Sequence, residues 1–283
     1  MSLWLSLMGF FGALLVGLLT SNWLALVFIM EFTLFMFLFL MYEHNSLSLS
    51  PSSIKYFFAQ TVGSLCLFIS GLYLTIYLSM SNPIVILVLI VGLCLKIGLF
   101  PFHFWVMPVM SGLPYTMLGL LGIPMKILPL SLLASSSLVL SQKTVWSFLM
   151  LFLSSFSMIV GLLYGLRSVS IRAVLGASSI THGGWFLLAS ISGDMVMYFV
   201  MYSVMLILVV WSLHYHKLYA AGLGLVGMAG LPPFTLFFGK LAVLSAIIQQ
   251  NIPIGVVVVA LLTAVLSLFY YLKFAFCFLL INK

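Results

Sequence analysis

Long apolar runs recur along the whole chain, and they constrain its fold more than any other feature. About ten runs of roughly 20 residues are separated by short polar or Gly/Pro-rich stretches, and each is long enough for one helix to cross a bilayer. Only 5% of the 283 residues are charged, whereas 65% are hydrophobic. No soluble core could bury this much apolar surface. The sequence therefore predicts an all-α, polytopic membrane protein.

The expected transmembrane helices form one domain, with a first half in residues 1–140 and a second half in residues 141–283. The first five are Leu3–Leu19, Trp23–Tyr42, Tyr56–Leu78, Ile84–Trp105 and Pro114–Leu133. The second five are Val145–Leu166, Ala173–Ser190, Val196–Leu213, Gly222–Ile248 and Ile254–Ile281. An odd number of spans in each half implies two inverted five-helix repeats, a pattern of many ion-coupled transporters.

Prolines interrupt the fourth expected helix of each half. Pro101 removes one backbone hydrogen bond and is expected to kink its helix a turn beyond Lys96. Pro232 and Pro233 break the corresponding helix before Lys240. Such breaks are tolerated within a membrane where protein or water satisfies the freed backbone groups. They indicate a hydrated interior beside each lysine.

Loop charges predict the orientation of the chain. One face collects Lys55, Arg167, Arg172, Lys217 and Lys283, whereas the other has Lys143 and Asp194. Under the positive-inside rule, both termini lie on the cytoplasm-like side, which is the matrix of a mitochondrion. The basic residues are spread out rather than clustered, which argues against a nucleic-acid partner.

Ionisable side chains near the middle of the expected spans are the candidate functional residues. They are Glu31, Lys96, Lys126, His182 and Lys240. An ionised group at the bilayer centre costs at least about 2.5 kcal/mol, so such residues are rarely incidental. Any one of them could instead be a structural hydrogen-bond partner.

Proton exchange is the chemistry that these side chains favour. A lysine in apolar surroundings can load and unload a proton. Glu31 is the only mid-membrane carboxylate and is the natural partner of one lysine. His182 could relay protons through its two ring nitrogens, with Ser178, Ser179 and Thr181 holding water beside it. A histidine satisfied by a neighbouring helix is the structural alternative.

No metal or redox site is expected on this chain. Cys66, Cys94 and Cys277 lie far apart in apolar segments, and we interpret them as inert thiols. Two polar groups, Glu43 with His44 and His214 with His216 and Lys217, fall at span ends, where solvation explains them.

Four stretches are similar to a known family. They are Lys55–Gln60, Leu95–Trp105, Ser178–Trp185 and Gly230–Thr235 followed by Lys240. The chain resembles the chain 2 family of antiporter-like membrane subunits of mitochondrial NADH:ubiquinone oxidoreductase, respiratory complex I, in a shortened, nematode-like form. The resemblance covers nearly the whole chain, although longer members add a helix after the tenth span.

The resemblance implies a site and a setting. Glu31 would form an entry ion pair with Lys96, Lys126 would be the connecting lysine, and Lys240 would lead to the exit half-channel, with His182 on the same hydrophilic axis. The chain would be a core subunit without a cofactor, because other subunits bind NADH, FMN, iron–sulfur clusters and ubiquinone. Its partners would be the other membrane-arm subunits and the phospholipids of the mitochondrial inner membrane. A stand-alone cation/proton antiporter and a structural or assembly subunit are the alternatives.

Overall fold

A computed structural model describes residues 2–43, 49–77, 82–140 and 144–281. Within these ranges the chain forms thirteen α-helices, one short 3-10 helix (η1) and no β-strand. The first half contains α1 (Ser2–Leu19), α2 (Trp23–Glu43), α3 (Leu49–Tyr77), α4 (Pro83–Ile97), η1 (His103–Trp105), α5 (Val106–Gly112), α6 (Tyr115–Gly122) and α7 (Pro124–Leu140). The second half contains α8 (Thr144–Arg167), α9 (Ile171–Ser192), α10 (Met195–His214), α11 (Leu218–Ala229), α12 (Thr235–Gln249) and α13 (Ile254–Ile281).

The described helices have the length and surface of a multi-pass membrane protein. Seven segments are long and apolar enough to cross a bilayer, and four shorter helices are also apolar. Large apolar side chains such as Trp4, Phe28 and Val196 are exposed on the outside of the bundle. Such continuous apolar exposure marks a surface that meets lipid or other membrane proteins.

Most helix bounds follow the apolar runs closely. The expected span Ile254–Ile281 coincides with α13, and α1, α2, α8, α9 and α10 begin and end within two residues of the expected limits. The expected start of the third span at Tyr56 was wrong, because α3 begins at Leu49. Pro51 lies in its first turn, where a missing N–H removes no helical hydrogen bond.

The two expected breaks are full interruptions, and a glycine ends the preceding helix in each. α4 ends before Gly98, which has φ 81° and ψ 46°, and α11 ends before Gly230, which has φ 82° and ψ 49°. Only glycine adopts this left-handed conformation without strain. The expectation of a kink at Pro101 was therefore wrong, because the helix has already ended at Ile97, four residues earlier.

A third interruption was not expected from the sequence. α6 ends at Gly122 and α7 begins at Pro124, so the fifth expected span is divided in two. Ile123 lies between the two helices with φ −119° and ψ −75°. A proline at the first position of a helix needs no backbone partner for its nitrogen. The division places Lys126 in the first turn of α7.

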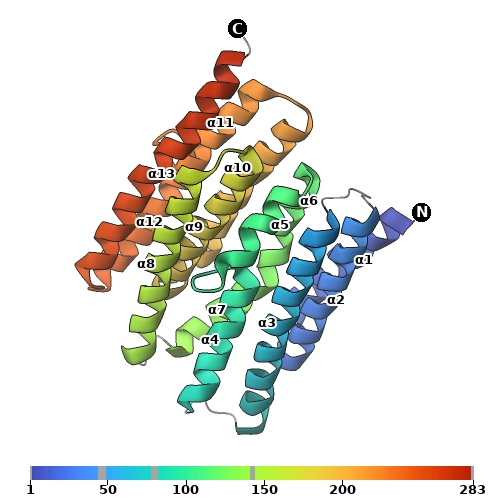
Figure 1. Cartoon of the computed structure of the whole chain (residues 1–283). Helices are drawn as coiled ribbons and strands as arrows, with labels where there is room; N and C mark the ends of the chain where they lie inside the picture. The colour runs from blue at the N-terminus through green and yellow to red at the C-terminus, as the bar shows by residue number, and fades with distance from the viewer. Residues whose placement is uncertain (1, 44–48, 78–81, 141–143, 282–283) are drawn as a thin grey trace.

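The two halves repeat the same packing neighbours. α2 packs against α1 and α3, and α3 packs against α4 and α5; likewise α9 packs against α8 and α10, and α10 packs against α11 and α12. The last helix of each half also has matching neighbours. α7 packs against α1, α2 and α4, and α13 packs against the corresponding helices α8, α9 and α11. Figure 1 shows α1 beginning and α13 ending at the upper end of the bundle, whereas α8 begins at the lower end.

Helix α9 occupies the centre of the molecule. It contacts α5 and α7 of the first half and α8, α10, α12 and α13 of the second half (Figure 1). Of its apolar window, 94% is buried. Gly161 of α8 permits a close approach to α9, because a Cβ there would lie 2.6 Å from the backbone nitrogen of Thr181. Residues of α9 therefore face other helices on all sides.

Candidate functional site

The five candidate residues lie on five different helices. Glu31 belongs to α2, Lys96 to α4, Lys126 to α7, His182 to α9 and Lys240 to α12. The three lysines and the histidine are buried, whereas 26% of the Glu31 side chain is exposed.

Glu31 and Lys96 form the ion pair expected from the sequence. Lys96 Nζ lies 3.5 Å from Glu31 Oε1, and only 3% of the lysine side chain is exposed. Gly63 of α3 makes room for the lysine, since a Cβ there would lie 3.2 Å from Lys96 Cγ. A buried charge is tolerated when a partner of opposite charge lies this close.

The carbonyl groups freed at the first break are bound by neutral side chains. Trp105 Nε1 donates to the Leu95 carbonyl at 3.1 Å, and Gln60 Nε2 donates to the Lys96 carbonyl at 3.2 Å. The last carbonyls of a helix have no partner within the helix. These two bonds therefore satisfy the end of α4 and leave the Lys96 ammonium free to face Glu31.

At the second break a lysine binds the freed carbonyl. Lys240 Nζ donates to the Ala229 carbonyl at 2.9 Å and lies 5.7 Å from the centre of the Trp185 ring. The C-terminus of a helix carries partial negative charge, and an aromatic face also attracts a cation. Both lysines adjoin breaks as expected, but on opposite sides: Lys96 precedes the first break, and Lys240 follows the second.

Lys126 contacts α9. Its Nζ donates to Ser179 Oγ at 2.7 Å, and it lies 5.8 Å from the ring centres of Phe186 and Tyr202. A cavity of about 10 Å³ is lined by both Lys126 and Lys96, together with Gln60 and Ser179. That volume is close to what one water molecule needs. The two lysines therefore adjoin one small polar space between the ion pair and α9.

His182 is held between two tyrosines. Its Nδ1 lies 2.7 Å from the Tyr198 hydroxyl of α10, and its Nε2 lies 3.4 Å from the Tyr271 hydroxyl of α13. A neutral imidazole has one donor nitrogen and one acceptor nitrogen. The tautomer of His182 therefore decides which tyrosine donates and which accepts. His182 is thus hydrogen-bonded by neighbouring helices, as the structural alternative expected. These contacts are also compatible with a proton relay through the two ring nitrogens.

The hydroxyls near His182 each form a hydrogen bond within the protein. Ser178 and Thr181 donate to the carbonyls of Leu175 and Ser178 within α9, and Ser179 accepts from Lys126. Such bonds to the preceding turn are common for hydroxyls within helices. Ser179 therefore contacts Lys126 directly.

One face of α9 links the lysines of the two halves. Ser179, His182 and Trp185 are three residues apart, which places them on the same side of a helix. Ser179 contacts Lys126, His182 contacts two tyrosines, and Trp185 contacts Lys240. Tyr198 and Tyr271 were not predicted, because a tyrosine within an apolar run carries no positional signal.

Interrupted helices and buried lysines within an all-helical membrane fold define an antiporter-like protein. A family model described as the transmembrane part of NADH:quinone oxidoreductase and Mrp antiporters matches residues 20–220. The chain belongs to this NADH:quinone oxidoreductase/Mrp antiporter family.

Curated relatives agree along nearly the whole chain. NADH-ubiquinone oxidoreductase chain 2 of Albinaria caerulea is 36% identical, over 95% of this chain and 86% of the relative. The protein of the same name from Anopheles gambiae is 30% identical, over 95% of this chain and 83% of the relative.

Solved structures show the same fold. A chain of respiratory complex I from Thermus thermophilus superposes with a TM-score of 0.81 at 21% identity, covering 97% of this chain and 70% of that one. A chain of the Mrp complex from Dietzia sp. superposes with a TM-score of 0.86 at 14% identity, covering 95% of this chain and 59% of that one. Both neighbours are parts of multi-subunit membrane complexes.

Proposed function

We propose that this chain is a proton-translocating membrane subunit of NADH:ubiquinone oxidoreductase, respiratory complex I, in the mitochondrial inner membrane. Family membership and the names of the relatives support this assignment. The observation that carries the site is the series of contacts from Glu31 through Lys96 and Lys126 to α9 and Lys240. The chain itself would carry no redox centre and would depend on other subunits for NADH, FMN, iron–sulfur clusters and ubiquinone.

Proton transfer would proceed along these contacts. A change of state in neighbouring subunits would bias the Glu31–Lys96 pair, and Lys126 and His182 would pass the effect through α9 to Lys240. Such coupling requires that the driving reaction stabilise one arrangement over another. Moving one charge against each 100 mV of membrane potential requires about 2.3 kcal/mol.

We also propose ten spans in two inverted five-helix repeats. The matching neighbours of the two halves support this architecture, as do the nearly equal dihedral angles of Gly98 and Gly230. The interrupted segments share the pattern Gly-Leu-x-Pro-Phe, at Gly98–Phe102 and at Gly230–Phe234. Both termini would face the matrix, with Lys55, Arg167, Arg172 and Lys217. Lys143 and Lys283 lie outside the described residues.

The replacement Lys96→Ala tests the proposed function. Proton pumping and NADH:quinone turnover would be measured in membranes, with the assembled complex quantified in the same sample. We expect near-normal assembly, with pumping per complex reduced by about tenfold or more. The matched control is Lys273→Ala, since Lys273 is an exposed lysine of α13. Normal pumping per assembled Lys96→Ala complex would contradict a role in translocation, and parallel losses of abundance and pumping would favour a structural subunit.

A stand-alone cation/proton antiporter is the second candidate, favoured by the fold shared with the Mrp complex. The purified chain alone would be reconstituted in liposomes carrying a pH gradient. Cation-dependent collapse of the gradient by this chain would favour the antiporter, whereas exchange only in the assembled complex would favour the subunit.

A further inference from the structure

A groove on the outside of the first half runs beside the first interrupted helix. It has a volume of about 640 Å³ and lies between α3 on one side and α4, η1 and α5 on the other. Binding sites for small molecules commonly have volumes of 300 to 1,000 Å³. The candidate proton route lies behind this groove, and none of its five ionisable residues lines it.

The length of the groove matches one leaflet of a bilayer. Ile54, Phe58 and Val62 form a stripe along α3, and Cys66 extends it just past the middle of the helix. At 1.5 Å per residue, the wall from Ile54 to Cys66 is about 18 Å long. Half of a bilayer's hydrocarbon core is about 15 Å thick. One acyl chain lying parallel to α3 would therefore fill the groove.

The charge of the groove is confined to one end. Lys55 is the only charged side chain among the described lining residues, and it is exposed. It forms no ion pair with any described residue. A lysine at the rim of an apolar groove between membrane helices suits an anionic headgroup, whose chain then lies along the apolar wall.

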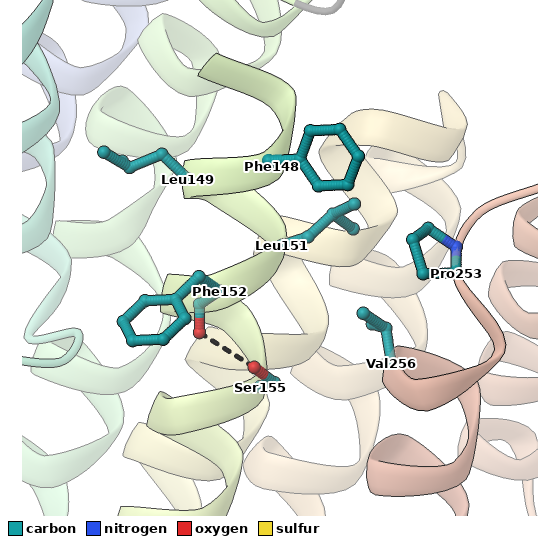
Figure 2. A pocket seen from close by; sticks show the side chains of 7 residues that line it. All are labelled: Phe148, Leu149, Leu151, Phe152, Ser155, Pro253 and Val256. Atoms are coloured by element: carbon teal, nitrogen blue, oxygen red, sulfur yellow. Dashed lines mark hydrogen bonds between the residues drawn. The ribbon is translucent and has the colours of Figure 1, made fainter. Parts of the chain in front are cut away.

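A second groove has no basic side chain among its described lining residues. It has a volume of about 540 Å³ and lies between α8 and the start of α13, where Figure 2 shows Phe148, Leu151 and Phe152 opposite Pro253 and Val256. Its polar lining side chain is Ser155, whose hydroxyl donates to the Phe152 carbonyl. No charged residue is among the described residues that line it, so the second groove provides an internal comparison for the first.

We propose that the groove along α3 binds a phospholipid with an anionic headgroup, held by Lys55 at the headgroup and by the apolar wall along one acyl chain. This site goes beyond the proposed proton translocation and does not depend on it. The acyl chain would contact Leu95 and Trp105, which are joined across the first break by the 3.1 Å hydrogen bond. The lipid would thereby cover the joint that positions Lys96.

Photo-crosslinking of the assembled complex tests the site. The complex would be placed in phosphatidylcholine nanodiscs containing a trace of photoactivatable phosphatidylglycerol, or of phosphatidylcholine with the same reactive chain. Crosslinks would be mapped to residues 54–66 and 91–108, and to the second groove. We expect phosphatidylglycerol to label the first groove about fivefold more than phosphatidylcholine, because one lysine contributes about this factor. Both lipids should label the second groove equally.

Three variants separate the contributions of charge and shape. Lys55→Gln should abolish the preference for phosphatidylglycerol, and Ala59→Trp, which fills the groove, should reduce labelling by both lipids. Arg167→Gln, at a basic residue outside the groove, should change neither. Equal labelling of the unsubstituted chain by the two lipids, or a preference that survives Lys55→Gln, would overturn the proposal. Displacement of the label by an equal amount of a neutral ubiquinone analogue would also overturn it, and would assign the groove to a quinone.

Discussion

At the scale of single residues, the contact between Lys126 and Ser179 is the shortest link between the two halves of the candidate route. Ser179→Ala removes the 2.7 Å acceptor of the ammonium and leaves the Ser179 carbonyl, which is 3.4 Å away. A hydrogen bond to a charged group is worth about 1.5–3 kcal/mol. We therefore expect proton pumping per assembled complex to fall by about tenfold. Ser136→Ala is the matched control, since this buried serine donates to the Leu133 carbonyl within α7, and an equal loss there would refute the link.

The two tyrosines beside His182 give a second prediction. Tyr198 lies 2.7 Å from one ring nitrogen, and Tyr271 lies 3.4 Å from the other. If His182 relays protons, Tyr198→Phe removes the stronger bond and should slow pumping more than Tyr271→Phe does. Initial rates of pumping and quinone reduction in the same membranes would measure the difference. Unchanged rates in both variants would leave the tyrosines with a packing role.

At the scale of helices, the glycines that end α4 and α11 can be tested by comparison with a third glycine. Gly98, Gly193 and Gly230 all have positive φ, but they differ in the space around an added Cβ. At Gly193 the Cβ would have no neighbour within 4 Å. At Gly230 it would lie 3.1 Å from Lys240 Nζ, and at Gly98 it would lie 2.3 Å from Val106 Cγ2. Gly193→Ala should therefore cost only the backbone strain, about 1–2 kcal/mol. Gly98→Ala should be more destabilising, and Gly230→Ala should also reduce pumping because it displaces Lys240. Thermal melting of the purified complexes measures the order of stability of the three variants. A Gly193→Ala complex with a lower melting temperature than the Gly98→Ala complex would contradict the prediction.

The packing of α8 on α9 gives a prediction about assembly. An added Cβ at Gly161 would lie 2.6 Å from the backbone of Thr181, so Gly161→Ala must push the two helices apart. Overpacking of this kind costs about 1–3 kcal/mol. We expect less assembled complex, measured by native gel electrophoresis. Gly12→Ala on α1, where an added Cβ has no neighbour within 4 Å, should assemble normally.

At the scale of the whole molecule, the orientation in the membrane can be measured with single cysteines. Arg167 and Asp194 lie at opposite ends of α8 and α9. If the basic end faces the matrix, a membrane-impermeant maleimide should label Asp194→Cys in intact mitoplasts, and Arg167→Cys only after the membrane is opened. The unsubstituted chain, with Cys66, Cys94 and Cys277, supplies the background. The reverse pattern would invert the proposed topology.

The sequence predicts some parts of this molecule better than others, for physical reasons. Apolar runs determine where a membrane helix begins and ends, which is why α13 was predicted to the residue. That Glu31 pairs with a lysine was predictable, because a lone mid-membrane carboxylate needs a basic partner; that this lysine is Lys96 was implied by the family resemblance, and the structure shows the pair. Which lysine adjoins the shared cavity, and which tyrosines reach His182, depend on how helices distant in sequence pack, and no local pattern encodes that.

The central position of α9 has a consequence for synthesis of the chain. Of the seven long apolar segments, α9 has the lowest mean hydropathy, and it is almost entirely covered by other helices, including α12 and α13. Those last helices are translated after it: α13 begins at Ile254, whereas α9 ends at Ser192. At roughly 5–20 residues per second, α9 waits roughly 3–12 s for its final neighbour. During that interval its serines and His182 must be shielded by an insertion factor or by an earlier helix, so slowed translation beyond Ser192 should reduce the yield of assembled protein.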